Sequence, residues 1–162
     1  MDKKINLVLA SDDNYAQHAA VALMSACEKC GHGYTVNGFI LDGGISPEKK
    51  DRIQRSVSAY NAKVSFIEID VEKFSKSYIS FQYTPAIYYR LDLPNILGTS
   101  IKKCLYVDCD LLFMDDISEL WNTDLEGFPV GAVEDILVMT NELFMQSQIY
   151  SNLRITFLSP LL

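Results

Sequence analysis

Short apolar runs alternate with helix-like segments along this chain, and this alternation limits its fold more than any other sequence feature. Residues 5–10 are almost wholly apolar, which is typical of a strand covered on both faces. Apolar side chains then recur from Ala16 to Cys27 at helical spacing, and Gly31 and Gly33 end that segment. Strands that alternate with helices predict an α/β layer structure with a mostly parallel central sheet.

The same pattern continues through the rest of the chain. Ser46 and Pro47 predict a helix start, because serine caps helices and proline suits the first turn. Another helix is expected over residues 84–91, with Pro94 ending it. Further strands are expected at residues 34–41, 63–69, 104–107 and 129–133.

The length of 162 residues corresponds to about one domain. We expect this α/β domain to cover residues 1–150. Residues 151–162 end on apolar side chains without a capping helix, which is unusual for the end of a domain. We therefore expect an atypical tail there and a domain that is truncated at its C-terminus.

The acidic character of the chain excludes some partners. A formal net charge of −7 argues against nucleic acid, because phosphate neutralisation needs Lys and Arg. No apolar run reaches the roughly 18 residues of a membrane span, and the N-terminus lacks a signal-peptide pattern. We expect a cytoplasmic protein with at most peripheral contact to the inner face of the membrane, and its oligomeric state is left open.

Two acidic clusters follow strands, the position at which open α/β sheets bind ligands. They are Asp12-Asp13-Asn14, after the first strand, and Asp108-Cys109-Asp110, after the apolar strand 104–107. In extended backbone, Asp108 and Asp110 would point to one side and repel unless a cation lies between them. Carboxylates suit magnesium or manganese, which could bridge them to a diphosphate. Neither cluster is accompanied by a glycine-rich phosphate loop.

Other interpretations compete for these motifs. Aspartates after a strand are often only turn formers or helix caps. An EF-hand loop starting at Asp108 is rejected, because Leu112 and Phe113 stand where an oxygen ligand and a glycine are required. A haloacid-dehalogenase-type phosphatase is disfavoured, because Leu111 and Leu112 replace its usual Gly-Thr. The apolar run over residues 111–114 favours a ligand site over a simple turn.

Two further features favour structural roles. Cys27-x-x-Cys30 lies at a helix end, whereas a thioredoxin-like pair opens a helix, and further zinc ligands at suitable spacing are missing. Four cysteines in a chain of this size do not predict a disulfide scaffold either. The helix from Pro47 is basic, which usually marks a solvated face, with contact to anionic lipid or acceptor as the lesser alternative. Its basic residues are Lys49, Lys50, Arg52 and Arg55.

Four segments carry a resemblance to a known family. They are Leu7-Val-Leu-Ala-Ser-Asp-Asp-Asn-Tyr-Ala16, Tyr88-Tyr-Arg-Leu91, Lys103-Cys-Leu-Tyr-Val-Asp-Cys-Asp110 and Leu120-Trp-Asn-Thr-Asp-Leu125. In this order and spacing they resemble glycosyltransferase family 8, which includes bacterial lipopolysaccharide galactosyl- and glucosyltransferases and glycogenin. The resemblance implies a Rossmann-like nucleotide-diphospho-sugar transferase fold. It also implies retaining hexosyl transfer from UDP-galactose or UDP-glucose to a glycan or lipopolysaccharide-type acceptor.

The resemblance implies a nucleotide-binding role for several residues near the first strand. Asp12 would accept a hydrogen bond from the uracil ring, and Tyr15 would stack on that ring. Asn14 would contact the nucleotide, while Ala10 and Cys109 would contribute backbone groups. The chemistry agrees, because a carboxylate only accepts hydrogen bonds and a tyrosine face can stack on a base. Packing at a helix start remains the alternative for Tyr15.

The resemblance also implies metal and catalytic roles. Asp108 and Asp110 would ligate a divalent cation, usually manganese and otherwise magnesium, and Asp108 would also hold the ribose. Arg90 would reach the donor sugar and diphosphate, although a surface charge on a helix is the alternative for this residue. Asp135 would face the donor sugar and the acceptor.

The sequence also departs from the family pattern. The family's third metal ligand is a histidine in a His-x-x-Gly-x-x-Lys-Pro-Trp-like segment, and only His18 and His32 are present. The family's Asn-x-Gly-Val-type segment is missing as well. We therefore expect the nucleotide side of a site without its opposite side, and a non-catalytic nucleotide-sugar-binding fragment is the alternative function.

Overall fold

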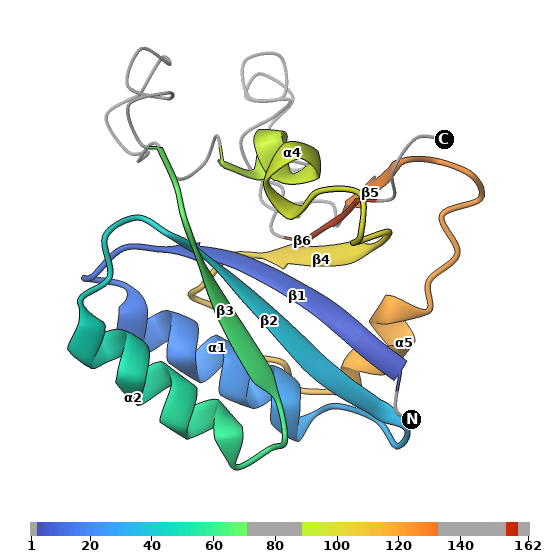
Figure 1. The fold of residues 1–162 in the computed structure, drawn as a ribbon. Helices are drawn as coiled ribbons and strands as arrows, with labels where there is room; N and C mark the ends of the chain where they lie inside the picture. Colours follow the sequence, from blue (N-terminus) through green and yellow to red (C-terminus); the bar gives the residue numbers. More distant parts are fainter. Residues whose placement is uncertain (1–2, 71–88, 133–154, 159–162) are drawn as a thin grey trace, which may run out of the picture.

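The computed structural model describes residues 3–70, 89–132 and 155–158 (Figure 1). The strands are β1 (Lys3–Ser11), β2 (Tyr34–Asp42), β3 (Lys63–Glu68), β4 (Cys104–Val107), β5 (Val130–Ala132) and β6 (Ile155–Leu158). The helices are α1 (Ala16–Glu28), α2 (Pro47–Ser58), α4 (Leu93–Leu97) and α5 (Ile117–Trp121), with a 3₁₀ turn η2 (Arg90–Asp92). Of the helices that the structure describes, none combines the length and apolar character needed to cross a membrane.

These strands form one sheet in the order β3-β2-β1-β4-β6-β5. β1 pairs in parallel with both β2 and β4, and β2 pairs in parallel with β3. The chain therefore moves outward from β1 through β2 and β3, and then returns to the other side of β1 with β4. Ligands of open α/β sheets bind beyond the carboxyl ends of the strands at such a reversal. The predicted Rossmann-like α/β fold is confirmed, and its reversal lies between β1 and β4.

Alternate residues of β1 and β4 contribute to hydrophobic clusters on opposite faces of the sheet. Figure 1 shows α1 and α2 on one face and α4 on the other. On the α4 face, Val8, Cys104 and Tyr106 pack with Leu93 of α4. On the face of α1 and α2, the two strands contribute Ile5, Leu7, Leu9, Leu105 and Val107.

A buried carboxylate fixes the turn between β2 and α2. Asp42 Oδ1 accepts hydrogen bonds from the backbone N–H groups of Gly44 at 2.9 Å and Ile45 at 2.6 Å. Its Oδ2 pairs with Lys50 of α2. Burial acts to raise the pKa of Asp42, but the bonds from Lys50, Ile45 and Gly44 outweigh it and hold the pKa below its ordinary value. The predicted start of α2 at Ser46 and Pro47 is confirmed, although the Ser46 side chain makes no capping bond.

The expected helix end at Pro94 is wrong. Pro94 lies in the first turn of α4, and Gly98 is the C-cap. Proline lacks an N–H, but the first turn of a helix leaves its N–H groups unbonded in any case, so proline can begin a helix. The helix predicted from residue 84 lies largely outside the described residues, and η2 covers Arg90 within its predicted end.

The sheet also includes part of residues 151–162, for which the sequence predicts an atypical tail. β6, within residues 151–162, lies between β4 and β5 and pairs antiparallel with both. The predicted strand near residue 130 is confirmed as β5, although Val133 lies outside the described residues. The domain boundary at residue 150 stays a prediction.

Candidate functional site

The ends of β1 and β4 lie side by side where the strand order reverses. Their parallel register pairs Leu7 with Leu105 and Val8 with Tyr106. Carried two residues further along each strand, this register places Ala10 level with Asp108. The fold therefore brings the two acidic clusters to one edge of the sheet, although they are far apart in the sequence.

Asp12 holds the loop between β1 and α1. Its Oδ1 accepts the backbone N–H of Tyr15 at 3.0 Å, and Tyr15 is the N-cap residue of α1. A carboxylate has about four lone-pair sites, so this bond leaves Asp12 acceptor capacity for a ligand. The Tyr15 side chain is 50% exposed, and its ring centroid lies 5.3 Å from that of His18. Because Tyr15 is half exposed, packing at a helix start is the weaker interpretation of this residue. Its exposed ring offers an aromatic face beside the Asp12 carboxylate, which is a hydrogen-bond acceptor.

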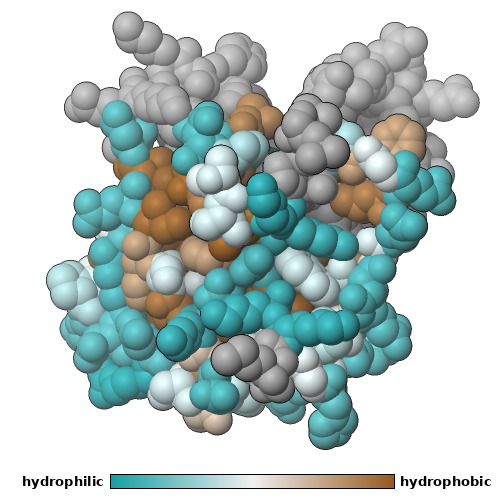
Figure 2. All heavy atoms as spheres, turned by 45° about the vertical axis from the view of Figure 1, so that its right-hand side comes forward, coloured by the Kyte–Doolittle hydropathy of each residue, from teal (hydrophilic) through white to brown (hydrophobic). Residues whose placement is uncertain are grey.

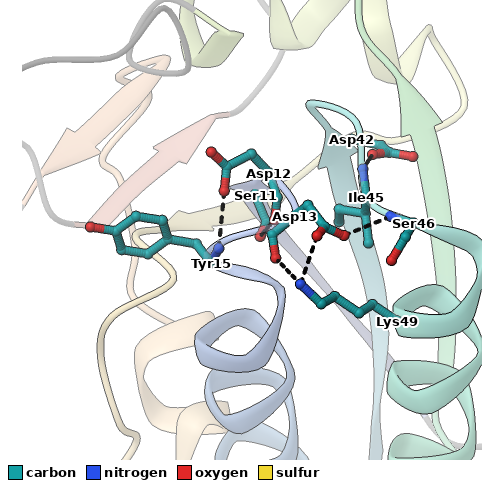
Figure 3. Close-up of polar contacts among 8 residues, drawn as sticks. All are labelled: Ser11, Asp12, Asp13, Tyr15, Asp42, Ile45, Ser46 and Lys49. Atoms are coloured by element: carbon teal, nitrogen blue, oxygen red, sulfur yellow. Dashed lines mark hydrogen bonds and ion pairs between the residues drawn. The ribbon is translucent and has the colours of Figure 1, made fainter.

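Asp13 supports the scaffold instead. Figure 3 shows its side chain directed toward α2, whereas the Tyr15 ring points away from this group. Asp13 Oδ1 accepts the Ser46 N–H at 2.9 Å, and its Oδ2 lies 2.7 Å from Lys49 Nζ. The bonds from Lys49 and Ser46 lower the pKa of Asp13 to about 2. This acidic residue of the first cluster therefore ties the β1 loop to the start of α2.

Carboxylate partners occupy most of the basic side chains of α2. Lys49 pairs with Asp13 and Lys50 with the buried Asp42. Arg55 lies 3.5 Å from Asp51 one turn earlier, with both side chains exposed. These pairs favour a structural and solvated role for the helix over contact with anionic lipid or acceptor.

Arg90 joins the second acidic cluster from η2. Its Nη2 lies 3.2 Å from Asp108 Oδ1, and the side chains of Arg90 and Asp108 are 13% and 35% exposed. Its guanidinium carbon lies 4.7 Å from the centroid of the Tyr106 ring. The alternative of a solvated surface charge is wrong, because this arginine is largely buried and bonded to the motif.

Two buried tyrosines at this edge were not predicted as site residues. Tyr106 is 2% exposed, and burial raises its pKa to about 12 despite the charge and hydrogen bond of Arg90. Tyr89 is also buried, and burial together with the charge of Asp12 raises its pKa. A sequence signal was present, because Tyr106 is the polar-tipped residue of an apolar strand two positions before Asp108.

The charges of both acidic clusters act on the Cys109 thiol. Burial is the main cause that raises its pKa to about 11, and the charges of Asp110, Asp108 and Asp12 raise it further. The parallel pairing of β1 and β4 therefore brings the charges of both clusters to one edge of the sheet. The backbone role of Cys109 stays a prediction.

The Asp108–Asp110 motif lies in a turn and not in extended backbone. β4 ends at Val107, where its pairing with β6 also ends, and Cys109 and Asp110 belong to a turn. The argument that strand pleating directs both carboxylates to one side is therefore wrong. Asp108 and Asp110 share one location because a single short turn at the end of β4 carries both.

The apolar run after the motif divides between core and surface. Leu111 and Phe113 pack against the cluster on the α1 face, and the Phe113 N–H donates to Ser25 Oγ at 3.1 Å. Leu112 and Met114 are 57% and 78% exposed. Figure 2 shows apolar residues gathered over part of one face of the molecule, beside hydrophilic surface. The inward pair of side chains anchors the turn of the motif to α1.

The donor set fits an incomplete site for a hard cation. Asp108 and the exposed Asp110 offer carboxylate oxygens, and an aspartate bonded to arginine keeps lone pairs for a metal. Within the described part of the chain, no group of three or more His, Cys, Asp or Glu side chains is arranged to hold a metal ion. Metal ligation by Asp108 and Asp110 therefore stays a prediction.

Three other residues are predicted to belong to the site. Ala10 lies near the end of β1 and is partly buried, and Asn14 is exposed in the loop that follows. Both lie at the edge where the acidic clusters meet, and their contacts with a nucleotide stay predictions. Asp135 lies outside the described residues.

The structure supports structural thiols at Cys27 and Cys30. All four cysteines are free. Burial raises the pKa of Cys27 to about 12 and also raises that of Cys30. A redox-active pair would instead need a lowered pKa, because the thiolate is the nucleophile.

Comparison with solved structures identifies the class of protein. The crystal structure of the galactosyltransferase LgtC in complex with donor and acceptor sugar analogues aligns with a TM-score of 0.84 at 26% identity. The alignment covers 96% of this chain and 58% of LgtC. Mouse xyloside xylosyltransferase 1 shares the fold, with a TM-score of 0.69 at 16% identity over 96% of this chain and 66% of that chain. The fold thus defines a glycosyltransferase domain of the GT-A-like class.

Comparison of sequences identifies the family. Glycosyl transferase family 8 matches residues 6–155, and this chain belongs to it. General stress protein A of Bacillus subtilis is 34% identical over 135 residues, which is 83% of this chain and 47% of that protein. Lipopolysaccharide 1,2-glucosyltransferase of Escherichia coli is 22% identical over 82% of this chain and 39% of that protein. The chain spans about half the length, or less, of these curated relatives.

Proposed function

We propose that this chain forms the donor-binding half of a retaining hexosyltransferase that uses a UDP-sugar and a divalent cation. The observation that carries the proposal is the parallel pairing of β1 with β4, which brings Asp12, Asp108 and Asp110 to one edge of the sheet. This edge also holds the exposed ring of Tyr15 and the buried guanidinium of Arg90. The ring is complementary to a nucleobase, the guanidinium to a diphosphate, and the carboxylates to the counter-ion of that diphosphate.

The nucleoside would bind at the β1 side of the site. Asp12 would accept the imide N–H of uracil, since an ionised carboxylate offers only acceptors. The half-exposed Tyr15 ring would stack on the base, with Asn14 and the backbone of Ala10 beside it. The Asp12–Tyr15 bond supports this arrangement, because it couples the position of the acceptor to the start of the helix that carries the ring.

The diphosphate would bind at the β4 side. Three carboxylates and one arginine leave this edge with an excess of negative charge, which opposes an anionic ligand. A divalent cation on Asp108 and Asp110, manganese or magnesium, would offset this charge and neutralise the charge that develops on a departing diphosphate. Arg90 would donate to diphosphate and sugar oxygens, for which its planar fork is suited.

The relatives support the reaction class. A glucosyltransferase and a galactosyltransferase are among the proteins to which this chain is similar, which favours UDP-glucose or UDP-galactose as donor. A glycan or lipopolysaccharide-type acceptor, catalytic roles for Arg90 and Asp135, and a cytoplasmic location near the inner face of the membrane belong to the same proposal. Binding without transfer is the alternative, favoured by the lack of a third metal ligand among the described residues.

Calorimetric titration of UDP, with and without manganese, tests the proposal. We expect manganese to strengthen UDP binding to the wild type, and Asp108→Ala/Asp110→Ala to remove that gain, because the cation loses its carboxylates. Asp51→Ala/Asp124→Ala is the matched control, since it changes net charge equally at exposed positions away from the motif. UDP binding that is changed neither by manganese nor by the motif substitutions would refute the metal site.

A second measurement separates transfer from binding alone. The 162-residue chain is incubated with UDP-glucose or UDP-galactose, and UDP release is followed over time. Sustained release that disappears in Asp108→Ala/Asp110→Ala would show that the described site supports turnover without a further ligand. Manganese-dependent UDP binding without release would favour the binding alternative for this chain.

A further inference from the structure

We infer that Tyr106 is a positioning residue of this site, and that its ring holds the guanidinium of Arg90 in place for anion binding. The relevance to a donor rests on the proposed function, whereas the contact between the two side chains does not. The guanidinium carbon lies 4.7 Å from the centroid of the Tyr106 ring. A cation at this distance from an aromatic face is attracted by the negative potential of the ring.

Tyr106 is a rigid platform. Its backbone lies between two neighbouring strands, in register with Val8 of β1 and Thr156 of β6. Its side chain is 2% exposed and belongs to the α4-face cluster with Val8, Cys104 and Leu93. Neither the backbone nor the ring can move far without breaking the sheet or its packing.

Arg90, in contrast, lies in a short element. It begins the three-residue turn η2, and its side chain is long and flexible. The ring attracts the guanidinium while its N–H groups bond oxygen atoms, and one such bond reaches Asp108. Tyr106 therefore holds the guanidinium near the motif, where its N–H groups can bond either the Asp108 carboxylate or an incoming anion.

The chemistry of position 106 distinguishes positioning from packing. Leucine would fill much of the space of the ring but would not attract a cation. Phenylalanine would keep the attraction and lose only the hydroxyl, on which Arg90 also acts through a hydrogen bond. We expect the ring, and not the hydroxyl, to be the part that matters.

A ligand-free experiment tests the contact itself. Unfolding midpoints are measured for Tyr106→Leu, Arg90→Ala and the double variant. We expect the unfolding midpoint of the double variant to fall by clearly less than the sum of the two single decreases, because each substitution already removes the shared contact. Leu105→Ala is the control, since Leu105 is on the same strand but packs on the opposite face, and its loss should add to that of Arg90→Ala. Additive losses for Tyr106 and Arg90 would overturn the inference.

A titration with UDP tests what the contact does. We expect Tyr106→Leu to weaken UDP binding about three- to tenfold when Arg90 is present, and by less than about twofold in the Arg90→Ala background. Tyr106→Phe should stay within about twofold of the wild type. Equal weakening by Tyr106→Leu in both backgrounds would indicate a purely structural role and overturn the inference.

A spectroscopic measurement covers the case in which Tyr106→Leu does not fold. In the wild type, ring current from Tyr106 should shift the side-chain NMR signals of Arg90 upfield, and Arg90→Lys identifies those signals by their loss. Unshifted Arg90 signals would overturn the inference. If the wild type binds no UDP, the proposed function fails, while the NMR signals and the unfolding cycle still decide the role of Tyr106.

Discussion

Asp116 Oδ1 accepts the backbone N–H of Gly31 at 3.0 Å, across 85 residues of sequence. The same oxygen accepts the Ser118 N–H at 2.8 Å, so Asp116 caps α5 while it holds the end of α1. The Ile117 N–H adds a bond to the Lys29 carbonyl at 2.9 Å. α5 follows the loop that leaves the Asp108–Asp110 turn, so this junction helps to place the candidate site.

Gly31→Ala should destabilise the protein by roughly 1–3 kcal/mol, the usual range for overpacking. An added Cβ would clash with Asp116 Oδ2 and lie 2.7 Å from Ser118 Oγ, so the carboxylate would have to leave its two bonds. Urea unfolding measures the effect. In an Asp116→Ala background the loss should be smaller, and an equal loss in both backgrounds would contradict the clash.

Asp13→Asn should lower the free energy of unfolding at pH 7 by weakening the link from the β1 loop to α2. The folded state depresses the pKa of Asp13 from 3.8 to about 2, so its stabilising effect is present above pH 3.8. The effect is lost as pH falls toward 2. The difference between wild type and variant, followed by urea unfolding across this window, should therefore shrink with acidification. A difference that does not depend on pH would contradict the ion pair with Lys49.

Asp42→Asn should be more harmful, by roughly 1–3 kcal/mol at pH 7, because it leaves Lys50 facing a neutral amide in a buried turn. The pKa of Asp42 is lowered in the folded state, so its contribution is also lost as pH falls below the ordinary carboxylate range. Thermal unfolding between pH 7 and pH 3 measures both effects. Asp51→Asn, at an exposed carboxylate of α2, is the control and should change little.

Tyr15→Ala should weaken UDP binding by about 5-fold or more, since stacking on a base contributes roughly 1–3 kcal/mol. Stability should change little, because half of this side chain is exposed. Tyr15→Phe keeps the ring and should bind UDP nearly as the wild type does. Tyr60→Ala, at an exposed tyrosine after α2, is the matched control. Unchanged affinity in Tyr15→Ala would leave this ring with a packing role only.

Alkylation of the native protein by iodoacetamide at pH 8 should be slow at Cys27 and Cys109. Their pKa values are raised to about 12 and about 11, so little reactive thiolate is present. We expect rates on the order of a hundredfold or more below those of an ordinary thiol, measured by peptide mass spectrometry. In urea both should react at ordinary rates. Fast native reaction at Cys109 would contradict the burial that is the main cause of its raised pKa.

Local sequence patterns predict the order and type of most elements. The apolar run of β1, the helical stripe of α1, and Ser46 with Pro47 at the start of α2 are local signals, because periodicity and capping depend on near neighbours. The acidic clusters were also visible, since aspartates after apolar strands stand out. Pro94 shows the limit of local signals, because proline is compatible with both a helix end and a helix start.

Which acidic residues lie together depends on the tertiary contacts between strands. Asp12 and Asp108 lie at one edge of the sheet because β1 and β4 are neighbours, and Asp13 turns away because Lys49 and Ser46 lie within reach. Strand order depends on contacts between distant segments, and periodicity along the chain does not encode those contacts. For the same reason, local patterns do not predict that β6 lies between β4 and β5. They also do not predict that Arg90 of η2 lies over the Tyr106 ring of β4.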